Sequence, residues 1–454
     1  MHTIAAIATP HAAGGIAVIR ISGSNARSVA QACFRSVTGK SVSEMPGYTC
    51  AYGKFVDPSG AELDDGIVTV FRAPHSYTGE DVVELSCHGG IFVTRQLLEN
   101  VYAAGAAPAE PGEFTKRAFL AGKMTLTQAE AVMDVIGAAG ARELSFAHAQ
   151  QNGALFHRVQ QITQGIVRSL GDLAAWADYP EDEIPAVTPE SLRASLLPVL
   201  EQLDSTLAAY DYGRILQSGV SAVIVGKPNV GKSTLFNLLS GSQRSIVTEI
   251  AGTTRDVVEE QIRLGNVTLR LSDTAGLRET ADVIEQMGVK IAEERLAQAD
   301  LILAVFDSTR PLDDDDMRML EQLPDKPVIA ILNKSDQTAQ LDTAALEQRF
   351  AQVITMAAKD GSGLEQLRQA VEERFYQAEV TPELGIVANA RQKQCLEQAK
   401  EQVQLALDAL DAGEMLDAVT VLLEEAADAL LTLTGERVSE AVVNDVFSRF
   451  CVGK

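Results

Sequence analysis

The alternation of hydrophobic and polar residues divides the chain into stretches of different texture, and the first of these covers residues 1–118. Short apolar runs lie at 15–22, 66–73 and 81–88, and helical spacing is found near 24–36 and 91–104. Short runs of this kind are typical of half-buried strands, and the Pro and Gly residues between them are typical of turns. The first stretch therefore predicts a compact α+β domain.

From about residue 119 the spacing of the apolar residues becomes helical. Residues 126–176 and 189–211 are rich in Ala, Leu, Gln and Glu, and the run DYPEDEIP at 178–185 between them is typical of a turn. A second helical stretch covers residues 388–450. Its expected apolar face consists of Leu396, Val403, Leu407 and Leu410.

Between the two helical stretches, strand-like and helix-like runs alternate. The strand-like runs lie at 221–226, 258–264, 267–272, 301–307, 327–332 and 353–356. This alternation predicts a mostly parallel sheet with helices on both faces. Because inserted domains have neighbouring termini, the simplest interpretation is one helical domain that carries an α/β domain as an insertion; two separate helical domains are the alternative. The expected limits are 1–118 for the first domain, 119–216 and 377–454 for the two parts of the helical domain, and 217–376 for the insertion.

The composition is typical of a multidomain globular protein. A chain of 454 residues has room for roughly two to four domains, and 46% hydrophobic residues can give each of them a core. The formal charge of −24 argues against non-specific binding of nucleic acid by the whole surface, so an RNA contact needs a local basic patch or a basic partner. We expect the run DDDD at 313–316 to be a solvated loop or the start of a helix.

Cysteine usage and the N-terminus indicate a cytoplasmic location. The cysteines are an odd number, include no C-x-x-C pair, and thus indicate a reducing compartment without a disulfide framework or a zinc site. The first residues lack the basic and apolar segments of a signal peptide, and no apolar window approaches about 18 residues. We therefore expect no membrane span. The five cysteines are Cys33, Cys50, Cys87, Cys395 and Cys451.

The run GKPNVGKS, which follows the apolar stretch SAVIV, fits the phosphate-binding pattern G-x-x-x-x-G-K-[ST]. Gly226 and Gly231 let the backbone turn tightly and direct its N–H groups at a polyphosphate. Lys232 can reach the β- and γ-phosphates, and Ser233 can hold Mg²⁺. For the motif taken alone, an accidental Gly-rich turn is the alternative.

The run NKSD, which follows PVIAIL, predicts a guanine nucleotide. The carboxylate of Asp336 can accept hydrogen bonds from N1–H and the exocyclic amine of guanine, a pair of donors that adenine lacks. Asn333 and Lys334 are expected to line the base pocket.

Two further runs supply the expected contacts to the metal and the γ-phosphate. In DTAG, which follows VTLRLS, Asp273 can bind Mg²⁺ through water and the Gly276 N–H can sense the γ-phosphate. In TEIAGTTRD, Thr253 and Thr254 are switch candidates whose hydroxyl groups can complete the metal shell.

The run AAK at 357–359 stands where a last base-contacting loop belongs. In this order along the chain, the motifs resemble the GTPase superfamily, which usually has Ser at the position of Ala357. The expected GTP contacts are Asn229, Val230, Gly231, Lys232, Ser233, Thr234, Thr248, Thr253, Thr254, Asp273, Gly276, Asn333, Lys334, Asp336, Ala357 and Lys359.

Leu277 stands directly after DTAG, where Ras-like enzymes place a Gln that orients the attacking water. An apolar side chain cannot polarise water, so the catalytic group must come from elsewhere. A carboxylate of the following segment can orient or deprotonate the water through one bridging molecule; a surface charge at a helix start is the alternative. The charged residues of this segment include Arg278, Glu279, Asp282 and Glu285.

Longer motifs make the resemblance more specific. They are IAVIRISG at 16–23, YTGEDVVELSCHGG at 77–90, PGEFTKRAFLAGKMTLTQAEAV at 111–132, GKPNVGKS, IAGTTRD, DTAGLRE and the terminal FCVGK at 450–454. With these, the chain resembles the MnmE (TrmE) family of tRNA-modification GTPases over its whole length. The TGED…HGG run and the C-terminal pentapeptide are the most specific, because other GTPases lack them. Val452 stands where the family usually has Ile.

The resemblance implies that the N-terminal domain dimerises and binds a one-carbon tetrahydrofolate, in the 5-formyl or 5,10-methylene form. The chemistry agrees, because the glutamate tail of a folate needs cations and the donors of its pterin suit a carboxylate. Taken alone, Arg20 and Glu84 also fit an ordinary ion pair between strands. By motif match, the folate contacts are Arg20, Glu84, Lys123 and Lys454.

Two residues near these motifs have open roles. His88 lies between Cys87 and Gly89, where a structural turn residue and a catalytic residue are the alternatives. Cys451 is either a reactive thiol of the modification step or a small buried residue.

The resemblance also implies a GTPase that is activated by K⁺ and by dimerisation of its nucleotide domains. Asn229 matches the asparagine that binds K⁺ in these relatives, and backbone groups around Thr248, Ile250 and Thr253 would complete the cage. A monovalent cation beside the β- and γ-phosphates offsets the charge that develops in the transition state.

The remaining roles follow from the same match. Ser233 and Thr254 are the implied Mg²⁺ ligands. Glu285 aligns with the catalytic glutamate of the family, and the catalytic candidates are Glu285, Arg278 and Cys451.

The implied function is that of a cytoplasmic, homodimeric GTPase in tRNA modification. With an FAD-containing MnmG partner, in a heterotetramer or a larger complex, it would form 5-aminomethyl or 5-carboxymethylaminomethyl uridine at the wobble position of tRNA. A regulatory GTPase switch that binds RNA or a ribosome and modifies nothing is the alternative. A folate-dependent enzyme that acts on a small molecule is a third possibility, which the GTPase insertion disfavours.

Overall fold

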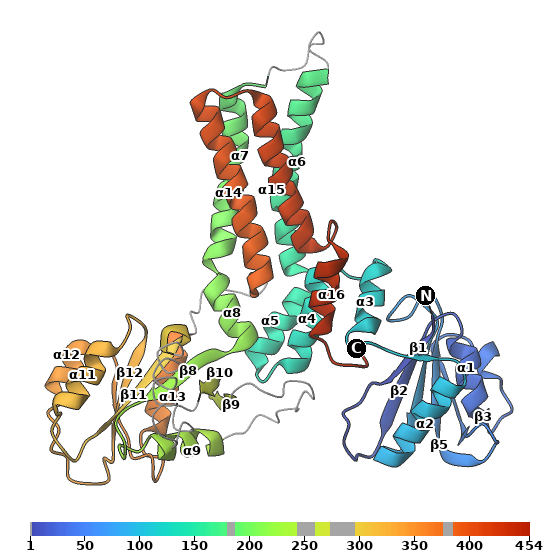
Figure 1. Ribbon diagram of the computed structural model, residues 1–454, viewed down its shortest axis with the longest axis horizontal. Helices are drawn as coiled ribbons and strands as arrows, with labels where there is room; N and C mark the ends of the chain where they lie inside the picture. The colour runs from blue at the N-terminus through green and yellow to red at the C-terminus, as the bar shows by residue number, and fades with distance from the viewer. Residues whose placement is uncertain (1, 179–186, 243–258, 273–295, 376–384) are drawn as a thin grey trace, which may run out of the picture. The chain divides into compact units, whose positions relative to one another are not determined.

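The computed structural model describes residues 2–178, 187–242, 259–272, 296–375 and 385–454 (Figure 1). The chain divides into two compact units. The first consists of Met1–Met133, Gln150–Asp204 and Gln394–Lys454, and the second of Asp134–Ala149 and Ser205–Lys393. The expected domain limits at residues 118, 216 and 376 stay predictions.

The N-terminal part of the first unit is built on a seven-stranded sheet with the order β3-β4-β5-β6-β2-β1-β7. Neighbouring strands are antiparallel except β1 and β7, which are parallel. The strands are β1 (Ile4–Ile7), β2 (Ala17–Ser22), β3 (Phe34–Ser36), β4 (Thr49–Val56), β5 (Glu62–Phe71), β6 (Val82–Cys87) and β7 (Ala107–Pro108).

Helices α1 (Ala26–Cys33) and α2 (Ile91–Ala103) cover one face of this sheet. Since side chains alternate along a strand, the residues between the buried ones point to the other face, and Arg20 and Glu84 are among them. On that face Phe114 of α3 (Glu113–Leu120) packs against the start of β1. The core on the helix side includes Ile19, Ile21, Val29, Val68, Val70, Val83, Leu85, Leu97 and Val101.

Two glycines, Gly53 and Gly66, lie opposite each other in β4 and β5. A Cβ on Gly53 would lie 2.5 Å from the ring of Phe34, and one on Gly66 would lie 2.7 Å from the ring of Phe55. The two rings are fully buried, and their centroids are 5.4 Å apart. The nearest atoms to the two Cβ positions are the backbone carbonyl oxygens of Arg35, at 2.2 Å, and Ser86, at 2.1 Å. The missing side chains therefore leave room for the neighbouring strands as well as for the aromatic pair.

The rest of the first unit is mainly helical. In Figure 1, α6 (Ala154–Asp178) and α15 (Leu416–Thr434) run beside α7 (Pro189–Ala208) and α14 (Ala390–Ala412). Arg193 of α7 pairs with Asp411 of α14, and Lys400 of α14 lies 2.7 Å from Asp204 of α7. Helices from both sides of the predicted insertion thus pack together. The expected apolar face of Leu396, Val403, Leu407 and Leu410 is buried.

A small core closes the end of this unit. It joins α4 (Leu126–Gly137) to α16 (Glu440–Ser448) and to Phe450, which follows α16. The ring of Phe447 lies 5.1 Å from that of Phe450 and 6.2 Å from that of Phe119, between centroids. This packing brings the C-terminal tail to the N-terminal part of the chain.

The second unit contains a six-stranded sheet with the order β13-β12-β11-β8-β10-β9. The strands are parallel except β9, which pairs with β10 as a hairpin. The multidomain fold class, with an α+β part, helices and a mostly parallel α/β sheet, is confirmed. The strands are β8 (Val220–Val225), β9 (Glu259–Leu264), β10 (Val267–Ser272), β11 (Leu301–Asp307), β12 (Val328–Asn333) and β13 (Val353–Thr355).

Helices cover both faces of this sheet, as the alternation predicts. Helices α9 (Lys232–Ser242) and α13 (Leu364–Phe375) pack on one face, and α11 (Asp314–Gln322) and α12 (Ala344–Arg349) on the other. The carboxyl ends of the parallel strands then carry the loops that hold the sequence motifs, which is where open α/β sheets bind ligands.

Segments outside residues 217–376 also belong to the second unit. Helix α5 (Ala141–Gln151) contributes Phe146, and α8 (Tyr210–Ser218) contributes Leu216, to a small core with Ile386 and Ala388. The Thr268 hydroxyl donates a hydrogen bond to Glu143 at 2.5 Å. Residues before and after the nucleotide motifs are thus part of one packed body with the sheet.

Helix boundaries differ in part from the sequence prediction. The helical stretch 126–176 is divided into α4, α5 and α6, and Gly153, with a φ of +87°, forms the second break. A positive φ suits glycine because it lacks a Cβ. Among the helices of the described residues, none is long and apolar enough to cross a membrane.

We expect Gly66→Ala to destabilise the N-terminal sheet by about 1–3 kcal/mol, because the added methyl group would clash with the Ser86 carbonyl of β6 and with the ring of Phe55. Amide hydrogen exchange in β4, β5 and β6 measures the loss. Gly15→Ala is the matched control, since nothing lies within 4 Å of its Cβ position. Equal protection in wild type and Gly66→Ala would contradict this account of the glycine pair.

Candidate functional site

The phosphate-loop motif lies between β8 and α9, as the sequence predicts. Gly226 and Gly231 have φ values of +151° and +104°, and Asn229 has a φ of +64°. Lys232 begins α9 and donates hydrogen bonds to the carbonyl groups of Gly226 at 2.6 Å and Lys227 at 2.7 Å. The lysine thus lies over the loop, and the N-terminus of α9, where Ser233 and Thr234 are exposed, is suited to an anion.

Asn333 joins this loop to the base-contacting motifs. It is 3% exposed; its Nδ2 donates to the carbonyl of Val230 at 2.8 Å, and its Oδ1 accepts from the N–H of Ala358 at 2.9 Å. A Cβ on Gly231 would lie 2.0 Å from Asn333 Nδ2, so only glycine leaves room for this bridge. Asn333 therefore sets the spacing of three loops that are far apart in the sequence.

The other predicted base contacts surround this bridge. Lys334 has a φ of +67°, and its ammonium lies 2.5 Å from Asp307 at the end of β11. Burial raises the pKa of Asp307, but hydrogen bonds from Lys334 and Thr309 outweigh it and hold the pKa below its usual value. Asp336 and Lys359 are exposed, and Ala357 is buried.

The run DDDD is the start of a helix. Asp313 caps α11 with a capping box, and Asp316, which is 1% exposed, pairs with Arg310 at 2.6 Å. Asp313 also accepts from Lys227 of the phosphate loop at 2.6 and 2.7 Å. The sequence prediction missed this tie between the loop and α11, because no local pattern pairs a lysine with an acid so far along the chain.

Several predicted site residues lie outside the described residues. These are Thr248, Ile250, Thr253, Thr254, Asp273, Gly276, Arg278 and Glu285. The described β9–β10 hairpin separates the two segments that contain them. The structure therefore brings together the phosphate loop and the base motifs, and the switch and catalytic predictions stay predictions.

In the first unit, the predicted folate contacts Arg20 and Glu84 face each other on β2 and β6. Two nitrogens of the Arg20 guanidinium, Nε and Nη2, each lie 2.9 Å from Glu84 Oε1. The guanidinium also lies over the rings of Tyr77 and Phe114, 5.6 and 5.7 Å from their centroids. The pair is thus half-buried in an aromatic setting, on the face of the sheet opposite α1 and α2.

The C-terminal tail docks at the same place. Arg20 Nη1 donates to the carbonyl of Gly453 at 3.2 Å, and the N–H of Phe114 donates to the carbonyl of Lys454 at 3.1 Å. Burial lowers the pKa of the Lys454 ammonium, and the charge of Arg20 lowers it further. Cys451 is half-buried in this tail, so both interpretations of its thiol stay open.

The fourth predicted folate contact, Lys123, has a different setting. Its ammonium donates to the carbonyl groups of Pro74 and Ser76, both at 2.9 Å. The structure therefore brings Arg20, Glu84 and Lys454 together, and it shows Lys123 as the anchor of the loop at 74–76.

Comparisons with known proteins show the family of the chain. A model of the MnmE helical domain matches residues 126–451, and a model of the GTP-binding protein TrmE N-terminus matches residues 3–123. The tRNA modification GTPase MnmE of Acetivibrio thermocellus is 40% identical over 456 residues, which cover 100% of this chain and 99% of that protein. The corresponding protein of Geobacillus kaustophilus is 41% identical over 457 residues, with the same coverage. The chain belongs to the MnmE family.

Among solved structures, the MnmE-family chain matches Era of Aquifex aeolicus bound to GDP and AlF4⁻. That match is 30% identical and covers 41% of this chain and 67% of the Era chain. Its TM-score of 0.28 is too low to support a structural argument. The family assignment therefore depends on the two domain models and the full-length relatives.

The TGED run, one of the most specific MnmE motifs of this chain, is held by hydrogen bonds and ion pairs to other elements. Glu80 of the TGED run accepts from Arg117 of α3 at 2.9 Å and from the Ser22 hydroxyl at 2.8 Å. Arg117 is 4% exposed and also bonds Glu113 at 2.7 Å. Asp81, the last residue of the run, pairs with Arg27 of α1 at 2.7 Å. The motif thus ties both faces of the N-terminal sheet to one loop, a role that the sequence alone did not reveal.

We expect Asn333→Ala to weaken GTP and GDP binding by on the order of tenfold or more, because it leaves the Val230 carbonyl and the Ala358 N–H without a partner. Titration with a fluorescent guanine nucleotide measures the affinity. Gln337→Ala, an exposed side chain that follows NKSD, is the matched control. Wild-type affinity in Asn333→Ala would show that the bridge does not set the nucleotide loops.

Proposed function

We propose that this MnmE-family GTPase is the GTP-hydrolysing subunit of a complex that modifies C5 of the wobble uridine of tRNA. The product is the 5-aminomethyl or 5-carboxymethylaminomethyl derivative, and a one-carbon tetrahydrofolate supplies the carbon. An FAD-containing MnmG subunit is the partner, in a heterotetramer or a larger complex. The chain works as a homodimer in the cytoplasm and uses GTP, Mg²⁺ and K⁺.

The observation that carries this proposal is the cluster of Arg20, Glu84 and Lys454 at the docked tail. Its donor set suits one end of a folate: the Glu84 carboxylate can accept from the N–H donors of the pterin, and the neighbouring cations can donate to its acceptors. The rings of Tyr77 and Phe114 beside Arg20 suit an aromatic ligand. A GTPase without a one-carbon donor would need only the structural part of this cluster, the bonds of Arg20 to Glu84 and to the tail.

The nucleotide loops fit GTP. Lys232 and the N-terminus of α9 can hold the phosphates, and Ser233, the first residue after that lysine, can bind Mg²⁺. Asn229 is exposed on the same loop, where its side chain can take part in binding K⁺. These residues bind and orient; Glu285 and Arg278 are the proposed catalytic groups, and Thr248, Ile250, Thr253 and Thr254 the proposed remaining metal contacts.

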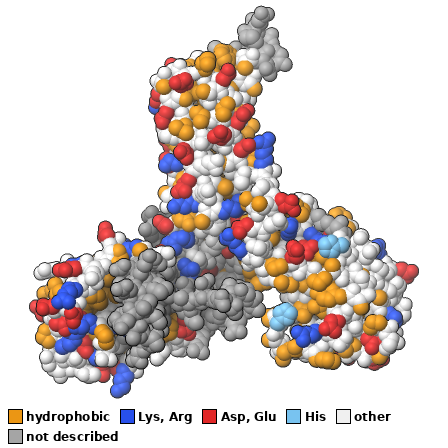
Figure 2. Space-filling model, in the orientation of Figure 1, with side chains coloured by type: hydrophobic (Ala, Val, Ile, Leu, Met, Phe, Trp, Pro, Cys, Tyr) orange, Lys and Arg blue, Asp and Glu red, His pale blue; other side chains and the backbone are white. Residues whose placement is uncertain are grey.

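The charge of the chain supports a division of labour with the partner. On the face shown in Figure 2, acidic and basic side chains are interspersed over the helical part of the described residues. Together with the formal charge of −24, this supports a complex in which the partner supplies much of the positive charge for tRNA. Strong salt-dependent binding of tRNA by the isolated chain would count against this division.

A regulatory GTPase switch is the second candidate, and the nucleotide loops fit it equally well. Folate binding separates the two functions, because a switch that modifies nothing does not need a one-carbon donor.

We expect the full-length chain to bind 5-formyltetrahydrofolate and Arg20→Gln to bind it at least tenfold more weakly. The substitution removes a cation and frees the tail carbonyl. Equilibrium dialysis measures the affinity. Arg95→Gln, an exposed arginine of α2, is the matched control. A wild-type chain that does not bind the folate would favour the switch.

We expect GTP hydrolysis to be much faster in KCl than in NaCl at equal ionic strength. In Asn229→Gly this difference should be lost, because the side chain is removed while glycine keeps the φ of +64°. Steady-state rates in the two salts, together with the affinity for GDP, make the test. Equal wild-type rates would remove the K⁺ mechanism and leave the GTPase assignment standing.

A further inference from the structure

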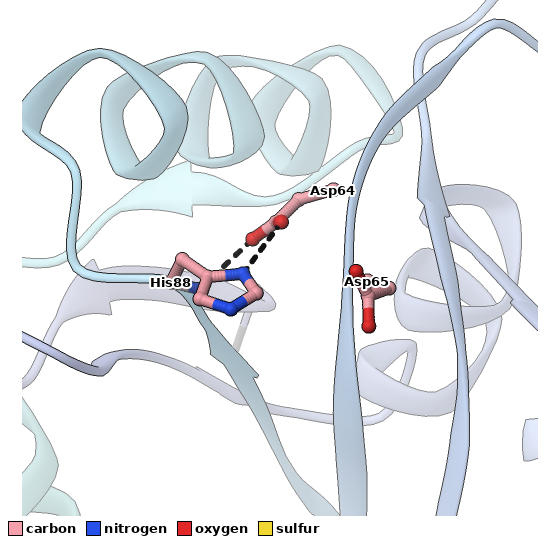
Figure 3. A group of neighbouring side chains, drawn as sticks. All are labelled: Asp64, Asp65 and His88. Carbon is pink, nitrogen blue, oxygen red and sulfur yellow. Dashed lines mark hydrogen bonds and ion pairs between the residues drawn. The ribbon is translucent and has the colours of Figure 1, made fainter.

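Asp64, Asp65 and His88 form a cluster of possible metal ligands on the N-terminal sheet, far along the chain from the nucleotide motifs (Figure 3). Asp64 and Asp65 belong to β5, and His88 follows the last residue of β6. The antiparallel register of these strands pairs Ile67 with Ser86, so its continuation sets Asp65 opposite His88. One ligand atom from each of the three residues lies within 4.8 Å of the other two.

The Asp64 carboxylate fixes the histidine. One oxygen lies 2.8 Å from His88 Nδ1, and the other accepts from the His88 backbone N–H at 2.8 Å. The Asp64 side chain is only 11% exposed, whereas that of His88 is 68% exposed. The imidazole is therefore oriented by a nearly buried carboxylate and remains open to solvent on its other side.

Asp65 is held from outside the cluster. Its Oδ2 accepts from the Tyr52 hydroxyl at 2.6 Å, which leaves its other oxygen unused by this contact. Lys54 is the register partner of Asp65, but its ammonium pairs with Glu62 at 3.5 Å. Among the described residues, neither Asp64 nor Asp65 forms an ion pair with a lysine or an arginine. In the part of the chain that the structure describes, the only cationic side chain that forms an ion pair with either carboxylate is thus His88.

We propose that Asp64, Asp65 and His88 bind a divalent cation of the zinc or cobalt class, at a site separate from the Mg²⁺ of GTP. Two carboxylates and one neutral imidazole match the charge of such an ion. The imidazole favours a borderline metal over Mg²⁺ or Ca²⁺, which prefer oxygen ligands. The sequence has no C-x-x-C pairs, and this argues against a zinc site built on cysteines but not against one built on His and Asp.

The three ligand atoms lie within 4.8 Å of one another, and small side-chain movements must bring them to the spacing that one ion requires. Two ligands of a tetrahedral zinc lie roughly 3.3 Å apart, so the His88 Nδ1 and Asp64 pair, at 2.8 Å, opens by about 0.5 Å when the metal replaces the proton between them. The Tyr52 hydroxyl and the His88 N–H hold the two carboxylates from behind, as outer hydrogen bonds do in metal sites. Three protein ligands leave at least one position for water or an anionic ligand.

This assignment gives His88 a third role beside the turn and catalytic interpretations of its sequence position. The ion would join β5 to the residues after β6. The N–H of Gly14 also bonds to the carbonyl of Gly89, so these residues are already tied to the loop before β2. A metal ion here would hold β5 and the end of β6 together, on the sheet whose open face carries Arg20 and Glu84.

The test is calorimetric titration of the full-length chain with Zn²⁺, in the presence of saturating GDP and Mg²⁺. We expect one zinc ion per chain, and at least tenfold weaker binding in His88→Gln and in Asp65→Asn. Co²⁺ in place of Zn²⁺ should give a visible absorption band that both substitutions remove. His148→Gln, an exposed histidine of α5, is the matched control and should bind like the wild type.

Two outcomes would overturn the proposal. One is a wild-type chain that binds no zinc under these conditions, and the other is equal affinity in wild type and both cluster variants. Far-ultraviolet circular dichroism and GTP hydrolysis show whether the variants fold. We expect both to stay at wild-type values, because Asp65→Asn keeps an acceptor for Tyr52 and neither residue belongs to the nucleotide site.

Discussion

The docking of the C-terminal tail on the N-terminal sheet is the constraint on which the rest of the molecule depends. The carbonyl groups of Gly453 and Lys454 accept hydrogen bonds from Arg20 and from Phe114. A Cβ on Gly453 would lie 2.3 Å from the carbonyl of Ile7, so the tail fits only without a side chain there. Because the tail lies against the N-terminal sheet, the chain has to pass from the first unit to the second and then back to the first.

This closure explains the organisation of the helices. The segments before and after the nucleotide motifs pack on each other as α6, α7, α14 and α15, so the outgoing and returning chain share one core. The chain passes between the two units at residues 133/134, 149/150, 204/205 and 393/394. In the sheet itself, Asn333 has a comparable role, because one buried amide holds the phosphate loop and the base loops at a fixed spacing.

The sequence predicts the repeating parts of this structure well, because their signal is local. The apolar runs of β2, β5, β6 and the nucleotide sheet give the strands, and the Gly and Lys positions of the phosphate loop give its conformation. Strands β1, β3 and β7 were missed, since strands of two to four residues have too few alternating residues to be distinguished from loops. Strand β4 has eight residues and was also missed, because Gly53 and Lys54 interrupt its apolar pattern.

In the candidate sites, too, the sequence predicts the features that have a local pattern and misses those that depend on the folded chain. Short motifs locate the loops around Lys232 and Asn333, but not the contact between Lys227 and Asp313, which depends on the folded chain. The family resemblance selects Arg20 and Glu84, whereas the bond from Arg20 to the tail and the loop contacts of Lys123 appear only in the structure. Long-range pairing of side chains leaves no pattern in a single sequence, and this is why the network of Arg117 and Glu80 also went unpredicted.

The charges at the docked tail argue for a ligand rather than for a purely structural role. Arg20 and Lys454 are two half-buried cations close enough for Arg20 to lower the pKa of Lys454, and the charge of Glu84, the ion-pair partner of Arg20, acts on Lys454 in the opposite direction. Burial of like charges costs free energy, and a chain with 62 acidic residues had many ways to neutralise them. An anionic ligand with more than one carboxylate could bind both cations. Ionisable groups whose pKa is shifted by burial and by a neighbouring charge are common at binding sites, and Lys454 is such a group.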